Sequence, residues 1–221
     1  MQRNSWSLEP REGAYQLLLT AEQLFAQEGF EAVSTRKVSR EAGQKNHSAL
    51  QYHFGNKEGL LSAILDYRIK PINELRERRL NDLLSRSRAP TVNGLVAAFV
   101  EPFSEQLRNP VEQTAYLSLL AQLFSYRRGR ELYNKHSEMN RALHDISEQL
   151  INCLDSCPLP VMHMRLQLMG RQSILAVAEW DDLRRAARKP MSEEIRVWRT
   201  RQLIQYIAGG LEASWDSEPQ S

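Results

Sequence analysis

Cysteine is scarce in this chain of 221 residues, which has only Cys153 and Cys157. They stand four positions apart, and no histidine or further cysteine lies at the spacing of a ligand set. Structural zinc sites need four Cys or His ligands at characteristic intervals. We therefore expect two thiols without a functional role, no metal site and no cofactor.

Long apolar runs are missing as well. No stretch is long enough to cross a bilayer as a helix, and the amino-terminal MQRNSWSLEPREGAY lacks the hydrophobic region of a signal peptide. The composition, with 42% apolar and 25% charged residues, is that of a globular protein. We expect a cytoplasmic protein with no membrane partner.

Sequence motifs of common enzyme classes are absent. There is no Gly-x-Ser-x-Gly elbow, no glycine-rich phosphate loop and no His-Glu-x-x-His zinc helix. His136, His144 and His163 are scattered and have no cysteine partner. We therefore expect a protein that is not an enzyme and has no catalytic residues.

Apolar residues recur at intervals of three and four along almost the whole chain, which predicts helices. No segment alternates with a period of two for long enough to form a strand. We predict an all-α protein of about nine helices, with a break or kink at Pro71. The expected helices span residues 11–28, 35–42, 47–53, 57–69 with a continuation beyond Pro71, 92–107, 111–126, 131–155, 161–189 and 193–215.

Positive charge is concentrated between residues 34 and 57. The net charge of the chain is only +2, but this stretch holds five Lys or Arg residues and one acid, Glu41. A local excess of this kind indicates a polyanionic partner or, alternatively, an ordinary solvated face. The order of the residues around it favours the polyanion.

Two short helices joined by a glycine-containing turn form a helix-turn-helix. On the second of them, His47, Ser48, Gln51 and Tyr52 share one face, and Ala49 and Leu50 point toward the core. Gln51 has the donor and acceptor pair that reads adenine, and His47 and Ser48 lie at the amino-terminal end that enters the major groove. We expect this face to read double-stranded DNA.

Other polar residues nearby suit phosphates. Lys45 in the turn and Tyr52 at the side are placed for this contact, and Lys57 lies at the start of a helix, where the dipole is positive. Asn46 is a helix cap or a base reader, and His53 contacts a phosphate or packs inside. The expected DNA-binding residues are Ser34, Thr35, Arg36, Lys45, Asn46, His47, Ser48, Gln51, Tyr52, His53 and Lys57.

Three fragments of this region, AEQLFAQEGFEAVSTRKVS, EAGQ and YHFGNKEGLL, together resemble the DNA-binding domain of TetR-family transcriptional regulators. Two departures stand out. One additional residue lies between Gly43 and Tyr52, and Gln44 stands where the family usually has a small apolar residue. The resemblance implies a flexible segment at 1–10, a three-helix DNA-binding domain at 11–58, and a larger helical dimerisation and ligand-binding domain at 59–221.

The last two long helices carry apolar residues suited to a dimer interface. The helix from residue 161 is apolar on several sides, so it must be covered on two faces, and Gly209 and Gly210 permit close backbone approach. The alternative is that both stripes are internal core. The expected interface residues are Val161, Met164, Leu168, Leu175, Val197, Ile204, Ile207, Ala208 and Leu211.

The resemblance also implies a small apolar or aromatic effector. Its candidate pocket residues are Phe103, Tyr116, Leu120, Phe124, Met169 and Trp180, which equally suit a core. The resulting hypothesis is an effector-responsive repressor that binds a pseudo-palindromic operator as a homodimer. The alternative is a helical interaction protein whose basic surface binds an acidic partner protein.

Overall fold

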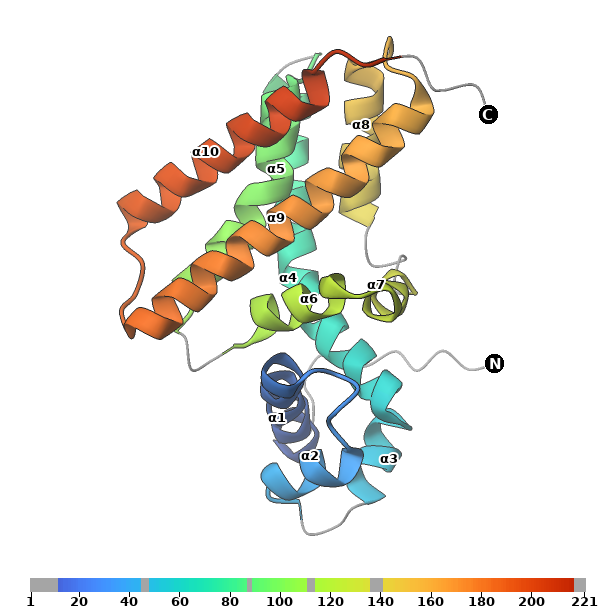
Figure 1. The fold of residues 1–221 in the computed structure, drawn as a ribbon, viewed down its shortest axis with the longest axis vertical. Helices are drawn as coiled ribbons and strands as arrows, with labels where there is room; N and C mark the ends of the chain where they lie inside the picture. The colour runs from blue at the N-terminus through green and yellow to red at the C-terminus, as the bar shows by residue number, and fades with distance from the viewer. Residues whose placement is uncertain (1–11, 45–47, 87–88, 111–113, 136–140, 217–221) are drawn as a thin grey trace. The chain divides into compact units, whose positions relative to one another are not determined.

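The computed structural model describes residues 12–44, 48–86, 89–110, 114–135 and 141–216. Within these ranges it contains ten α-helices, one 3-10 turn and no strand, which confirms the all-α class (Figure 1). None of the described helices is both long and apolar enough to span a membrane. The helices are α1 (Glu12–Glu28), α2 (Thr35–Glu41), α3 (Ser48–Phe54), α4 (Lys57–Arg86), α5 (Val92–Glu105), α6 (Tyr116–Ser125), α7 (Arg127–Asn134), α8 (Arg141–Cys153), α9 (Leu159–Ala187) and α10 (Glu193–Glu212), with η1 (Gln106–Arg108) after α5.

The helix boundaries differ from the expected ones in one place. Where two helices were predicted, at 111–126 and 131–155, the structure has three, α6, α7 and α8, which accounts for a count above nine. The helix α4 continues beyond Pro71, as expected, and is 30 residues long. A proline lacks one donor, but the remaining backbone hydrogen bonds hold the helix on both sides of it.

The chain divides into two compact units, and the division falls at Pro71 inside α4. The first comprises residues 1–71 and 111–139, so α6 and α7 belong with the amino-terminal helices. Its core includes Leu17 and Phe25 of α1, Val38 of α2 and Leu60 of α4, which are all fully buried. This unit extends beyond the 11–58 domain expected from the sequence, and the functional division of the chain stays a prediction.

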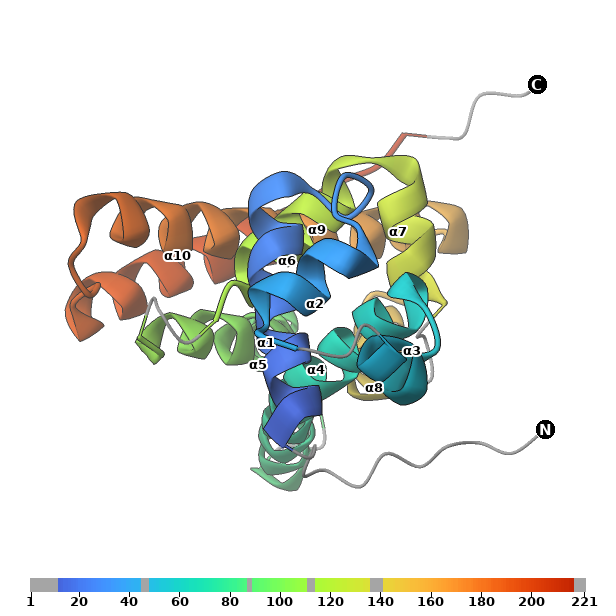
Figure 2. The same ribbon diagram turned by 90° about the horizontal axis from the view of Figure 1, so that it is seen from below.

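Local signals in the sequence set the helix ends in this first unit. Ser34 caps α2, because its hydroxyl accepts a hydrogen bond from the Lys37 amide at 3.2 Å. Gly29 follows α1 with φ of +86°, a conformation that residues with a Cβ rarely adopt. Both boundaries were predicted from the sequence and are confirmed. Figure 2 shows α2 and α3 beside α1 in this unit.

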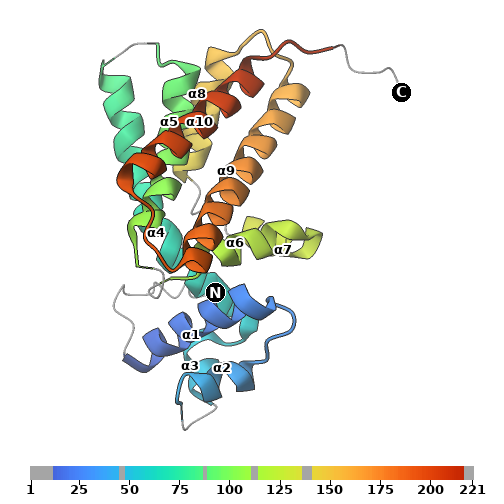
Figure 3. The same cartoon turned by 60° about the vertical axis from the view of Figure 1, so that its left-hand side comes forward.

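The second unit comprises residues 72–110 and 140–221. In it α10 packs along α5 and against α9, and α8 also packs on α5 (Figure 3). The apolar residues of α5, from Leu95 to Phe103, supply much of its core. Pro102 lies inside α5, close to its carboxyl end.

Candidate nucleic-acid interface

The two short helices α2 and α3 are held from beneath by apolar residues. Val38 of α2 and Leu50 and Phe54 of α3 are buried against the rest of the unit. The Gln44 side chain turns back to α1, where its amide nitrogen lies 3.5 Å from the Gly13 carbonyl oxygen. Gln44 therefore stands where the family usually has a small apolar residue, and it bonds to the backbone of α1.

The outer face of α3 presents the residues expected to meet DNA. Ser48, Gln51 and Tyr52 are exposed, and 77% of Tyr52 is accessible. The Tyr52 ring meets His53 edge-to-face, with centroids 5.0 Å apart, and His53 is half-buried beside Phe54. This arrangement leaves the hydrogen-bonding groups of Gln51 and Tyr52 accessible to a ligand. His53 supports the Tyr52 ring.

Residues at the start of α2 lie in the same unit. Ser34 and Arg36 are exposed, and Thr35 is half-buried. The Ser34 hydroxyl oxygen accepts the capping hydrogen bond from the Lys37 amide, so Ser34 would contact a phosphate by donating its hydroxyl hydrogen. Lys45, Asn46 and His47 lie outside the described residues.

Ion pairs reduce the free positive charge of the basic stretch. Lys37 bonds Glu28 at 2.6 and 2.7 Å, and Arg40 bonds Glu41 at 3.0 Å. Arg36 has no such acidic partner among the residues that the structure describes. It is therefore the cation of α2 best placed to bind a phosphate.

Lys57 requires a correction. Its ammonium group donates to the carbonyl oxygens of Phe30 at 2.9 Å, Glu31 at 3.2 Å and Val33 at 3.1 Å. An ammonium group has three donors, so all of them are used inside the domain. In this geometry Lys57 fastens the segment between α1 and α2, and it is not available as the phosphate contact predicted from the sequence.

The junction between α3 and α4 explains why the sequence requires FGNKEG there. The Asn56 side chain caps α4 by accepting a hydrogen bond from the Gly59 amide at 2.8 Å, as predicted. A Cβ at Gly59 would lie 2.0 Å from the Phe54 carbonyl oxygen, closer than any real contact. Only glycine allows α3 to approach α4 this closely, and this close approach fixes the position of α3.

The predicted effector residues are divided between the two units. Tyr116, Leu120 and Phe124 belong to the first, and the other three belong to the second. Phe103 is buried, with the Arg76 guanidinium 4.5 Å from its ring centroid, and Met169, Tyr116 and Leu120 are buried too. The structure therefore packs most of this set as core, which was the alternative reading of the same pattern.

The predicted interface residues separate into exposed and buried groups. On α9, Met164, Leu168 and Leu175 are 44–54% exposed, and Val197 of α10 is 39% exposed. Ile204, Ile207, Ala208 and Leu211 are buried within their own unit, so the prediction that they face a partner is corrected: they are core. Val161 is half-buried.

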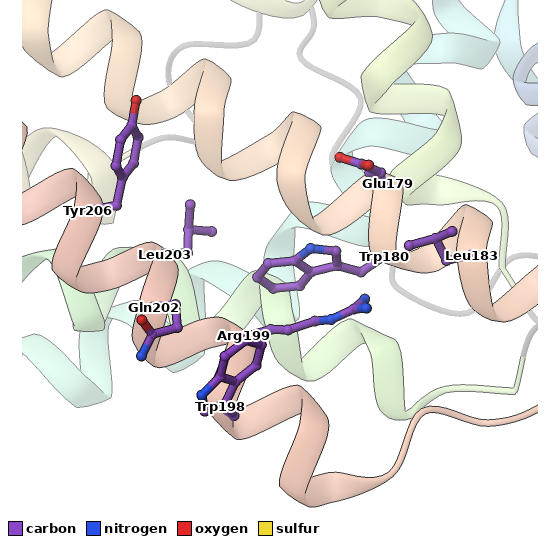
Figure 4. Close-up of a pocket in the computed structure, with 8 residues that line it drawn as sticks. All are labelled: Glu179, Trp180, Leu183, Trp198, Arg199, Gln202, Leu203 and Tyr206. Carbon is purple, nitrogen blue, oxygen red and sulfur yellow. The ribbon is translucent and has the colours of Figure 1, made fainter.

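Sequence reasoning missed the aromatic part of this surface. Trp198 and Tyr206 of α10 are 60% and 65% exposed. Figure 4 shows Trp180 of α9 beside Trp198 and Arg199 of α10 around an open pocket of about 420 Å³. The signal was present, because residues 195, 198, 202 and 206 follow helical spacing on the face of α10 opposite the buried stripe.

The sequence of the helix-turn-helix region is similar to that of a known protein family. Residues 17–64 match the model of bacterial regulatory proteins, tetR family. The match ends within α4 and covers the helix-turn-helix. No curated protein matches the sequence.

Solved structures match over most of the chain. The fatty acid degradation regulator FadR from Bacillus halodurans has 16% identity and a TM-score of 0.61, with 89% of this chain and 98% of that chain covered. NalD of Pseudomonas aeruginosa, a secondary repressor of a multidrug efflux pump, has 19% identity and a TM-score of 0.60, with 90% and 96% covered. AmtR of Mycobacterium smegmatis has 18% identity and a TM-score of 0.55, with 98% and 91% covered. At these identities the likeness is one of fold. Together with the match at residues 17–64, it confirms the resemblance seen in the sequence: residues 17–64 are similar to bacterial regulatory proteins of the tetR family, and the fold of the chain is similar to those of FadR and NalD.

Proposed function

We propose that this protein is a sequence-specific DNA-binding repressor that acts as a homodimer on a pseudo-palindromic operator. The observation that carries the proposal is the outer face of α3, where Gln51 and Tyr52 are exposed on a helix fixed from beneath by Leu50 and Phe54. In the proposed complex Gln51 and Ser48 contact base edges, and Arg36, Thr35 and Ser34 contact phosphates. Base contacts select the sequence, and phosphate contacts supply affinity and register.

The residues outside the described ranges complete the proposed interface. Lys45 is proposed to bind a phosphate, and His47 is proposed to reach the major groove from the start of the reading helix. Asn46 is proposed as the cap of that helix. The proposed role of His53 is to position Tyr52, since their rings pack at 5.0 Å.

A homodimer follows from the need for specificity. A single short recognition helix contacts too few base pairs to select a site in a genome, and two of them on a twofold axis read half-sites one helical turn apart. The exposed apolar residues Met164, Leu168, Leu175 and Val197, joined by Trp198 and Tyr206, support an interface on α9 and α10. Exposed apolar side chains in such numbers are typical of protein interfaces.

Regulation by a small apolar or aromatic effector is part of the proposal. The candidate pocket residues are the six predicted from the sequence. Most of them are buried, so a ligand would reach them only by displacing packed side chains. Such a ligand regulates only if it binds one conformation of the protein better than the other. If the ligand binds the conformation with the lower DNA affinity, the repressor releases its operator.

The test is selection of bound duplexes from random and genomic DNA with the purified full-length protein. The expected result is a pseudo-palindromic consensus bound with an affinity that falls steeply with salt, because phosphate contacts release counterions. A protein that binds all duplexes alike, and retains an acidic protein partner at the same salt concentration, would instead support the helical interaction protein.

A further inference from the structure

A polar pocket lies within the second unit, between α5 and α10. Its volume is about 560 Å³, inside the range of about 300–1,000 Å³ that is usual for small-molecule sites. Residues 93, 97, 101 and 105 line it from α5, and because they are four positions apart they share one face of that helix. The opposite wall comes from residues 193–205 of α10. Every residue that lines the pocket belongs to the second unit.

The lining of this pocket differs from the apolar effector site predicted from the sequence. Among the thirteen described residues that line it, only Ala97, Val197 and Ile204 are apolar, and seven are charged. The six effector candidates are not among them. An apolar ligand would cover these charged groups without offering them hydrogen bonds, which is costly. The lining therefore favours a charged ligand.

One cluster in the pocket carries net negative charge. The Arg79 guanidinium donates to Glu101 through one terminal nitrogen and to Glu105 through the other. Two carboxylates thus share one cation, which leaves this cluster with a net charge of −1. Both carboxylates are half-buried, and each uses one oxygen atom for Arg79. The second oxygen of each can accept a hydrogen bond from an ammonium group.

A second cluster carries net positive charge. Glu193 accepts hydrogen bonds from Arg196 at 3.0 and 2.6 Å and from the Nε atom of Arg108 at 3.2 Å. Arg196 is buried, and its Nη1 atom donates to the Ser104 hydroxyl at 2.8 Å, so its position is fixed from inside the unit. Arg108 is exposed and holds Glu193 through Nε and Nη2. Its Nη1 atom is left to donate to a ligand.

Arg201 of α10 adds another positive charge to the pocket. It is exposed, and it forms no ion pair with the residues that the structure describes. Together with the cluster around Glu193 it supplies a net charge of +2, beside the −1 of the cluster around Arg79. A ligand with complementary charges carries one ammonium group and two carboxylates.

We propose that the pocket between α5 and α10 binds an acidic amino acid. The ammonium group of the ligand lies at Glu101 and Glu105. Its two carboxylates lie at Arg108 and Arg201, whose planar guanidinium groups form paired hydrogen bonds with carboxylates. The ligand has a net charge of −1, which neutralises the excess of one positive charge among the four arginines and three glutamates of the pocket. It enters an open pocket without displacing packed side chains.

Isothermal titration calorimetry of the purified full-length protein with L-glutamate and L-aspartate tests the proposal. DNA is absent from the experiment, so its result is independent of the proposed operator binding. At least one of the two amino acids should bind, with one ligand per chain. Glutarate lacks the ammonium group and putrescine lacks the carboxylates, so both should bind about 10- to 100-fold more weakly, the change expected when hydrogen bonds between charged groups are lost. Absence of binding by both amino acids at millimolar concentration, or equal binding of glutarate or putrescine, would overturn the proposal.

Substitutions in the pocket test its location. Arg201→Gln removes a cation that forms no ion pair with the described residues, so it should leave the fold intact and weaken binding of the amino acid by about tenfold or more. Glu101→Gln should weaken it by a similar factor, and Glu105 still pairs with Arg79 in that variant. Arg171→Gln is the matched control, since Arg171 is an exposed arginine of α9 that does not line this pocket, and affinity should be unchanged.

Circular dichroism restricts the comparison to folded variants, and if Glu101→Gln does not fold, Arg201→Gln decides alone. A folded Arg201→Gln or Glu101→Gln variant that binds the amino acid as tightly as the native protein would show that the ligand binds elsewhere, and the proposal would be wrong.

Discussion

The ammonium group of Lys57 lies over the Phe30 ring, 4.5 Å from its centroid, and donates hydrogen bonds to three backbone carbonyl oxygens. The residue thus links the start of α4 to the segment between α1 and α2, and an aromatic face supplies a cation–π contact. Its charge is used for folding.

Lys57→Met should lower the free energy of unfolding by about 2 kcal/mol, because hydrogen bonds from a charged donor contribute about 1.5–3 kcal/mol each and part of that is recovered by solvent. Lys37→Met is the matched control, since its ion pair with Glu28 is partly exposed and should be worth less than about 1 kcal/mol. Denaturant unfolding followed by circular dichroism measures both. Unchanged stability with a smaller salt dependence of DNA binding would return Lys57 to the phosphate contacts.

Gly59→Ala should destabilise the first unit by at least about 1–3 kcal/mol, because the new Cβ would overlap the Phe54 carbonyl oxygen. Gly170→Ala is the comparison. It lies inside α9, where nothing is within 4 Å of the added carbon, and it should stabilise its helix by about 0.5–1 kcal/mol. Thermal unfolding of both variants checks the pair, and equal effects would mean that α3 does not need this close approach.

Gln51→Ala and Arg36→Ala should weaken DNA binding in different ways. Loss of the Gln51 amide should relax the preference at one base position of each half-site by about 1–3 kcal/mol. Loss of Arg36 should weaken every duplex about equally and lower the salt slope by about one per subunit. Fluorescence anisotropy with the operator and its single-base variants, at several salt concentrations, separates the two; identical profiles would contradict the assigned roles.

Leu175→Glu combined with Trp198→Glu should convert the proposed homodimer to a monomer. Both side chains are about half exposed on the face of α9 and α10, and a buried, unpaired carboxylate opposes association. Leu84→Glu changes a similarly exposed leucine of α4 and should leave the dimer intact. Sedimentation velocity gives the oligomeric state, and a double variant that remains dimeric would show that another surface mediates dimerisation.

Hydrogen bonds from Arg196 and then Arg108 lower the pKa of Glu193 to about 2. A lowered pKa stabilises the fold above the pKa of the unfolded state, and that contribution is lost as the pH falls toward 2. At pH 4 the carboxylate should therefore still be ionised. Arg108→Met removes one donor and should raise the pKa of Glu193, which a carbon-detected NMR titration of its carboxyl group measures; an unchanged midpoint would exclude Arg108 as a cause.

The sequence alone was enough for the helical class and for the reading domain. Periodicity at three and four residues located the helices, and Ser34, Asn56 and Gly29 marked their ends through caps and a left-handed turn. These are local properties of the chain. They need no knowledge of what lies across the core.

Periodicity could not identify which apolar stripe packs inside. Ile204 and Ile207 lie on one face of α10, and Trp198 and Tyr206 lie on the opposite one, and both faces carry apolar residues at helical spacing. The sequence pattern favoured the first face for a partner. The structure places α5 and α9 against it, because packing depends on residues far away in the chain.

What the sequence determined by itself is therefore the secondary structure, the resemblance of its helix-turn-helix to a known family and the residue types on α3, since each depends on spacing along the chain. Only the tertiary structure decided that Lys57 donates to the Phe30 carbonyl oxygen and that the Glu22 carboxylate of α1 accepts a hydrogen bond from the Ala115 amide, just before α6. It also decided that α6 and α7 belong to the first unit. The physical reason is that a donor or an apolar side chain can be satisfied by any suitable group brought near it. The fold determines which group that is.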